Sequence, residues 1–122
     1  MHKASVLSQL QQKYPGKTVI CLPEDEPTEI LCEIEPAAEH YEYSLAVAVI
    51  DFTAPHFHTK ITETYTVLRG ELVLRCNSTT LHLTTGQSYI IEPNQVHSAT
   101  GTATWVMCKS EPGWTKDDHH LV

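Results

Sequence analysis

The chain has 122 residues, 41% of them hydrophobic, which suits one domain (residues 1–122) with a single core. Its formal net charge of −7 offers no basic surface for phosphate groups, so we expect neither nucleic acid nor an anionic membrane as a partner. The longest apolar run, residues 45–50, is far shorter than the roughly 20 residues of a membrane-spanning helix, and no apolar secretion signal follows residues 1–7. These features predict a cytoplasmic protein.

A short amphipathic helix is predicted at about residues 4–14. Val6, Leu7, Leu10 and Tyr14 recur at helical spacing, and Pro15-Gly16 ends the pattern. We expect this helix to pack on the outside of the domain.

From Thr18 onward the chain consists of short β-branched or aromatic runs separated by turn residues. Strands are predicted at residues 18–21, 29–34, 42–50, 56–58, 61–68, 71–76, 79–83, 88–91, 96–100 and 103–109. Turns are predicted at Arg69-Gly70, Asn77-Ser78 and Thr85-Gly86. This density of short strands favours an all-β sandwich or barrel at about 18–109, with a C-terminal tail at 110–122. The acidic run at 23–27 is interpreted as a solvated loop.

The four cysteines are widely spaced and form no CxxC pair. Without a secretory context, we interpret them as small buried apolar residues, with a disulfide or a reactive thiol as the alternative. They are Cys21, Cys32, Cys76 and Cys108.

Three histidines and one glutamate form a pattern typical of a metal site. His56 and His58 are two residues apart in an extended segment, so their side chains point to the same side. Glu63 begins the next predicted strand, and His97 follows a turn and a short apolar strand. These side chains are predicted to converge as three nitrogen ligands and one oxygen ligand.

This ligand set suits Mn, Fe, Co, Ni, Cu or Zn and is too rich in nitrogen for Ca or Mg. An ion that prefers six ligands would keep two positions open for water or substrate. The alternative is a polar barrel rim that has lost its metal. We favour the metal site, because three imidazoles and a carboxylate are costly to bury in one cavity unless a cation pairs them.

Residues 56–70 resemble the first motif of the cupin superfamily, HXH(X)3-4E(X)6G, which His56, His58, Glu63 and Gly70 match completely. The glycine that precedes this motif in the family is Ile50 in this chain.

Residues 86–101 resemble the second cupin motif, with Gly86 and His97 in register. Glu92, Asn94 and Gly101 replace its proline, glycine and asparagine. Asn94 can still adopt the left-handed backbone of a glycine. The resemblance implies a double-stranded β-helix (jelly-roll) barrel of about 8–10 strands, here with one short N-terminal helix.

The same resemblance implies a homodimer and two classes of function. One is a metal-dependent enzyme acting on a small polar metabolite, of dioxygenase, decarboxylase or sugar isomerase/epimerase type. The other is a non-catalytic module that binds or senses a small molecule. No helix-turn-helix segment accompanies the barrel, which favours the enzyme.

Three aromatic residues are candidates for the cavity wall: Tyr65, Tyr89 and Trp105. Core packing alone is the favoured explanation for all three, and Tyr65 and Tyr89 are the first candidates for an accessory proton donor. Arg69 and Gln87 lie beside turn glycines and are expected to be exposed.

The C-terminal tail carries a second histidine pair. His119 and His120 are adjacent, so on a strand they would point to opposite sides and could not chelate one ion together. We therefore expect the tail to pack through Trp114 and Leu121 rather than to form a second metal site.

Overall fold

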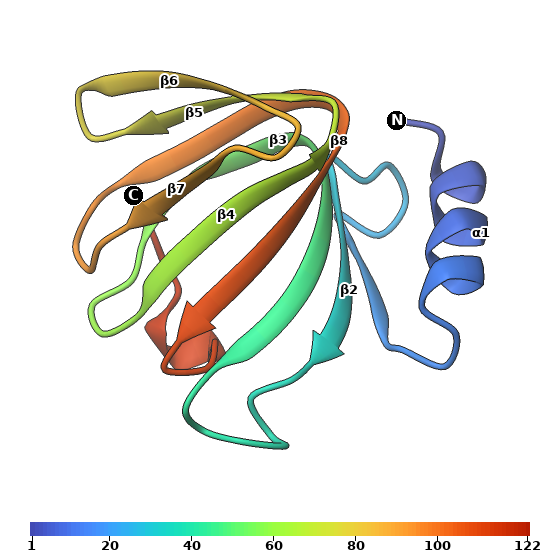
Figure 1. The fold of residues 1–122 in the computed structure, drawn as a ribbon, viewed down its shortest axis with the longest axis horizontal. Helices are drawn as coiled ribbons and strands as arrows, with labels where there is room; N and C mark the ends of the chain where they lie inside the picture. Colours follow the sequence, from blue (N-terminus) through green and yellow to red (C-terminus); the bar gives the residue numbers. More distant parts are fainter.

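The computed structural model describes residues 1–122 as a barrel of antiparallel strands with one helix on its outside (Figure 1). The elements in chain order are α1 (Lys3–Lys13), β1 (Val19–Leu22), β2 (Glu29–Glu35), β3 (Ser44–Phe57), β4 (Thr62–Arg69), β5 (Glu71–Cys76), β6 (Thr79–Thr84), β7 (Ser88–Ile91), β8 (His97–Glu111), the 3-10 turn η1 (Lys116–Asp118) and β9 (His120–Leu121). The predicted all-β fold of 8–10 strands with one short N-terminal helix is confirmed. No helix has the length and apolar character needed to cross a membrane.

The two longest strands, β3 and β8, hold the barrel together. They pair along their lengths, from Ser44 opposite Ser110 to His56 opposite His97. β8 also pairs with β5 through residues 97–101 and with β4 through residues 105–111. A single strand therefore connects the β5–β6 hairpin to the sheet with strand order β1-β2-β3-β8-β4-β7.

The sequence predicts two strands where the structure has β3 (residues 42–50 and 56–58) and two where it has β8 (residues 96–100 and 103–109). This division was wrong, because each is one continuous strand. The register of β3 shifts between Ile50 and Phe52 and again between Thr53 and His56, and β8 bends at Ala103, whose φ is 44°. Such bulges bend a strand without ending it, and a proline such as Pro55 is tolerated at a bulge. The turn-like residues that divide the sequence pattern therefore lie inside continuous strands.

Alternation of side chains along the strands produces two apolar clusters. The interior cluster includes Ile50, Val67 and Val106. The outer cluster joins Val6 and Leu10 of α1 to the opposite face of the sheet. Figure 1 shows α1 outside the sheet beside β2, as the helical spacing of its apolar residues predicts.

Trp105 belongs to the outer cluster, so it is a core residue, as the sequence favours, and it does not line the cavity. The neighbouring Val106 takes the inward position on β8, which turns Trp105 toward α1. There it borders a surface hollow of about 400 Å³ with Gln9, Gln12, Lys13, Leu68 and Arg69. The guanidinium of Arg69 lies 4.6 Å from the centre of the indole ring.

The three predicted turns are present, and each contains a residue with left-handed backbone. Gly70, Asn77 and Gly86 have φ values of 97°, 53° and 89°. Asn94 has φ 67°, so it adopts the conformation that glycine supplies in the cupin motif.

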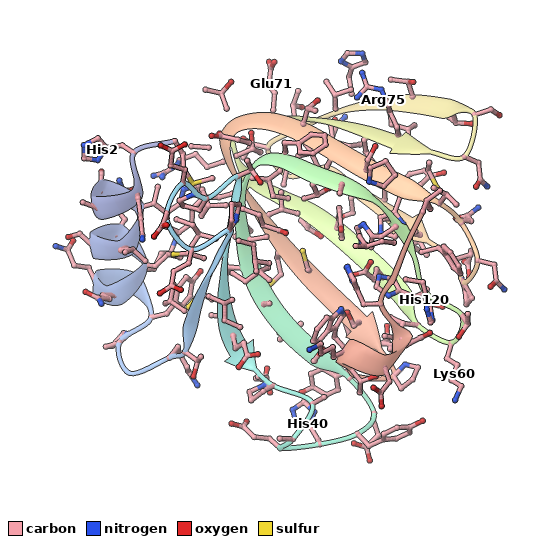
Figure 2. The ribbon with its side chains drawn as sticks, turned by 180° about the vertical axis from the view of Figure 1, so that it is seen from behind. His2, His40, Lys60, Glu71, Arg75 and His120 are labelled. Atoms are coloured by element: carbon pink, nitrogen blue, oxygen red, sulfur yellow. The ribbon has the colours of Figure 1, made fainter.

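The C-terminal segment, residues 114–122, is attached differently from the prediction. Trp114 and Leu121 are 41% and 69% exposed, so they do not anchor it. The buried Asp118 does: its carboxylate accepts hydrogen bonds from the backbone N–H groups of residues 59–61 and from the Thr59 hydroxyl, over 2.6–3.2 Å. β9 then pairs with the end of β3, and Figure 2 shows His120 and Lys60 at this same end of the barrel.

Candidate metal centre

The four side chains predicted as metal ligands lie together inside the barrel. One donor atom from each of His56, His58, Glu63 and His97 falls within 4.8 Å of the other three, and all four residues are buried. Residues from three separate parts of the chain therefore bring their donor atoms into one buried cluster.

Strand pairing explains this convergence. His56 near the end of β3 lies opposite His97 at the start of β8, and their rings are 4.1 Å apart. His58 lies two residues beyond His56, on the same side of the extended chain. On β4, Glu63 takes an inward position in the same alternation as Tyr65 and Val67.

Each of the three imidazoles is held through its Nδ1 atom by a backbone carbonyl. The acceptors are Ala54 for His56 at 2.8 Å, Asp118 for His58 at 2.6 Å, and Gln95 for His97 at 3.0 Å. Because a carbonyl can only accept, each Nδ1 carries the proton, which leaves the Nε2 lone pair for a metal ion.

The Nε2 atoms and the Glu63 carboxylate are close enough to share a proton or a metal ion. Glu63 Oε1 lies 2.9 Å from Nε2 of His58 and 3.1 Å from Nε2 of His97. The His58 contact lacks hydrogen-bond geometry, so this buried nitrogen has no hydrogen-bond partner. Lone pairs at such distances repel unless a proton or a metal ion lies between them. A divalent ion fits this donor set.

The pKa values reflect the same competition between burial and pairing. Burial raises the pKa of Glu63, but His58 and His97 outweigh it and lower the pKa to about 2. Burial and the neighbouring His97 lower the pKa of His56 to about 4. Burial lowers and the Glu63 carboxylate raises the pKa of His58, with a net upward shift. Glu63 is therefore ionised and His56 is neutral at neutral pH, as metal ligands must be.

The cupin domain family matches residues 47–108, just over half of the chain, including all four candidate ligands. This chain belongs to the cupin family. No curated protein matches the sequence.

Solved structures with the same fold share little sequence with this cupin. Pac13 from Streptomyces, a nucleoside dehydratase, has a TM-score of 0.76 and 14% identity over 89% of this chain and 87% of its own. KdgF from Halomonas has a TM-score of 0.66 and 16% identity, covering 78% and 88%. A Klebsiella pneumoniae protein with a double-stranded β-helix domain has a TM-score of 0.69 and 20% identity, covering 91% and 87%. These likenesses show the fold alone.

Tyr65 and Tyr89, the two predicted proton donors, lie directly opposite each other on β4 and β7. Tyr65 is buried, its ring is 6.1 Å from that of His97, and its hydroxyl has no hydrogen-bond partner in the chain. Burial and the charge of Glu63 raise the pKa of Tyr65 well above 10, so its hydroxyl stays protonated. Tyr89 is partly buried and packs against the interior cluster.

The inner face of the barrel also holds a carboxyl group that the sequence analysis missed. Glu29 on β2 pairs with Ile50 of the interior cluster, whereas its neighbour Ile30 belongs to the outer cluster. Its side chain makes no ion pair or hydrogen bond, and burial, then Glu63, raise its pKa to about 7. Glu29 follows the acidic run at 23–27 closely in the sequence, so composition alone suggests that it is solvated.

Sequence reasoning also missed the contribution of the C-terminal segment. The Asp118 carbonyl holds His58, and the ring of His119 stacks on that of His56 at 4.7 Å. The adjacent histidines at 119 and 120 were a sequence signal for a possible site. Only the pairing of β9 with β3 brings His119 to the candidate metal centre.

The four cysteines are free thiols, as interpreted from the sequence. Cys32 and Cys76 are buried, and Cys21 and Cys108 are partly buried.

Proposed function

We propose that this cupin binds one divalent transition metal ion (Mn, Fe, Co, Ni, Cu or Zn) through His56, His58, Glu63 and His97, and acts as an enzyme on a small polar metabolite. The observation that carries the proposal is the orientation of three buried imidazoles: each Nδ1 atom is held by a backbone carbonyl and each Nε2 atom is left available beside Glu63. A bound ion would act as a Lewis acid and as a template for the oxygen atoms of a ligand.

The side chains beside the candidate metal centre support chemistry on a polar molecule. Tyr65 presents a protonated hydroxyl on the inner face that can donate a hydrogen bond to a bound ligand. Tyr89 lies opposite it, and we propose these two residues as the candidates for an accessory proton donor. Among the structural neighbours, Pac13 is a nucleoside dehydratase with structures that contain uridine, a small polar molecule. Dioxygenation and sugar isomerisation or epimerisation are the reaction types that we propose to test first.

Elemental analysis of freshly purified protein tests the metal centre. We expect about one equivalent of a transition metal in the wild-type protein and much less in His58→Ala. His82→Ala removes an exposed imidazole on β6 and is the matched control, for which wild-type content is expected. Equal metal content in His58→Ala and His82→Ala would contradict the assignment.

A metabolite panel separates an enzyme from a non-catalytic binding module. Compounds that raise the melting temperature of the metal-loaded protein would be incubated with it, with and without oxygen, and the mixtures analysed for products. Product that depends on metal and is reduced in Tyr65→Phe supports catalysis. Binding without product under any metal would instead identify a binding or sensing module.

We also propose that the chain forms a homodimer. β1 is an edge strand, and two of its apolar side chains, Ile20 and Leu22, are 37% and 43% exposed. An exposed apolar strand edge is stabilised when a second chain covers it.

A further inference from the structure

A fourth imidazole lies beside the candidate metal centre. The ring of His119 stacks on that of His56, with centroids 4.7 Å apart and planes 26° apart, and lies 5.6 Å from the ring of His58. His119 is nevertheless exposed, whereas His56 and His58 are buried. It therefore lies on the solvent side of the candidate metal centre.

The nitrogen atoms of His119 are unused within the chain. Its side chain forms no hydrogen bond or ion pair, in contrast to the three candidate ligands, and it lies outside the four-residue group whose donor atoms converge. An imidazole placed against the site with both nitrogens available can bond to a molecule held by the metal ion.

Neighbouring contacts hold His119 in this position. On one side, Asp118 accepts four hydrogen bonds from residues 59–61, and on the other, His120 pairs with Phe57 in the β3–β9 ladder. Trp114 contacts the ring edge-on, with centroids 6.0 Å apart. A side chain fixed in this way loses little conformational entropy when it binds a ligand.

The charge of the loaded centre indicates the chemical class of that ligand. Three neutral imidazoles and one carboxylate around a divalent ion leave a net charge of about +1. The nearby Asp118 carboxylate keeps its negative charge, which four hydrogen bonds and the His120 imidazole at 3.3 Å partly offset. A small anion with two oxygen atoms could place one on the metal and the other toward an N–H donor.

We propose that His119 is a ligand-contacting residue of this metal centre and donates a hydrogen bond to a small carboxylate held by the metal ion. This inference rests on the proposed metal site and adds a residue from the C-terminal segment, outside both cupin motifs.

Acetate binding to the cobalt-loaded protein tests the inference without an activity assay. Cobalt content is measured first, and acetate is then titrated while the visible absorption of the metal is recorded.

His119→Phe keeps an aromatic ring for stacking on His56 but removes the donor. His119→Gln restores a donor, and His82→Ala is the surface control. We expect full cobalt content in all variants and an acetate dissociation constant raised about ten-fold in His119→Phe, since a hydrogen bond to a charged group is lost. His119→Gln should bind more tightly than His119→Phe.

Several results would overturn the inference. Equal acetate affinity in wild type and His119→Phe would exclude the hydrogen bond, and a wild-type protein that holds cobalt without binding acetate would exclude the ligand class. Loss of cobalt from His119→Phe would show that the residue acts on the metal itself. Absence of cobalt from the wild-type protein would refute the metal centre as well, and is visible before acetate is added.

Discussion

His58 donates its Nδ1 proton to the backbone carbonyl of Asp118 over 2.6 Å, although the two residues are 60 positions apart in the chain. The Asp118 carboxylate meanwhile binds the backbone of residues 59–61, immediately after His58. One residue of the C-terminal segment thus positions both a candidate ligand and the loop that follows it.

Replacing Asp118 with alanine is expected to weaken metal binding by about 10–100-fold, because hydrogen-bond partners that orient ligands have effects of this size. The loop at residues 59–61 would lose its acceptor, and the carbonyl that holds His58 would shift with the released segment. Chelator competition measures the affinity. Asp117→Ala changes the adjacent, exposed acid and should leave the affinity unchanged. The same affinity in both variants would show that Asp118 has no part in positioning His58.

Metal affinity should fall as the pH is lowered. The net upward pKa shift of His58 means that protons compete with the metal at this ligand at a higher pH than at an ordinary imidazole. His56, with a pKa of about 4, adds no competition near neutral pH. We expect affinity to fall by up to about tenfold per pH unit for one competing proton, as measured by titration calorimetry from about pH 8 to about pH 5. A constant affinity over this interval would argue against histidine ligation.

Glu29→Gln should stabilise the protein at neutral and alkaline pH. The folded-state pKa of about 7 exceeds the ordinary value of 4.5, so the wild-type protein loses stability as the pH rises between these values. Below about pH 4.5 both states are protonated, and the variant should match the wild type. Above pH 7 we expect a gain of roughly 2–3 kcal/mol in the free energy of unfolding, from urea denaturation. Glu26→Gln, in the exposed loop, should have no such effect. A pH-independent difference would indicate that the Glu29 carboxyl is solvated.

Leu10→Ala should cost about 2–5 kcal/mol of folding free energy, because Leu10 is fully buried between α1 and the outer face of the sheet. Leu7→Ala makes the same change at a partly buried position one turn earlier and should cost less. Thermal and urea unfolding would measure both. Equal losses would mean that α1 is not held to the sheet mainly through Leu10.

Light scattering tests whether the chain forms a homodimer and whether the edge strand β1 forms its interface. We expect the mass of a dimer for the wild-type protein and a shift toward monomer for Ile20→Lys, which places a charge on the exposed apolar edge of β1. Tyr41→Lys alters a more exposed aromatic residue away from that strand and should remain dimeric. A wild-type monomer at high concentration would reject the proposal.

The chain itself specifies most of the barrel through local patterns. The alternation around Glu63, Tyr65 and Val67 predicts which side chains face inward, and the structure buries all three. The glycine and asparagine turns are likewise encoded locally, and Asn94 adopts the predicted left-handed backbone. The period of two placed His56 and His58 on one side of the chain, and the resemblance to the cupin motifs identified Glu63 and His97 as the other two candidate ligands.

Only the tertiary structure decides what depends on pairing between distant segments. Whether Pro55 or Gly101 interrupts a strand or lies inside a bent one depends on the partner strand. Trp105 turns outward, and Glu29 inward, because of the strands and the helix packed around them. Asp118 and His119 lie beside the candidate metal centre because the two-residue strand β9 pairs with β3. Such contacts join residues far apart in sequence, so the local spacing of residue types cannot predict them.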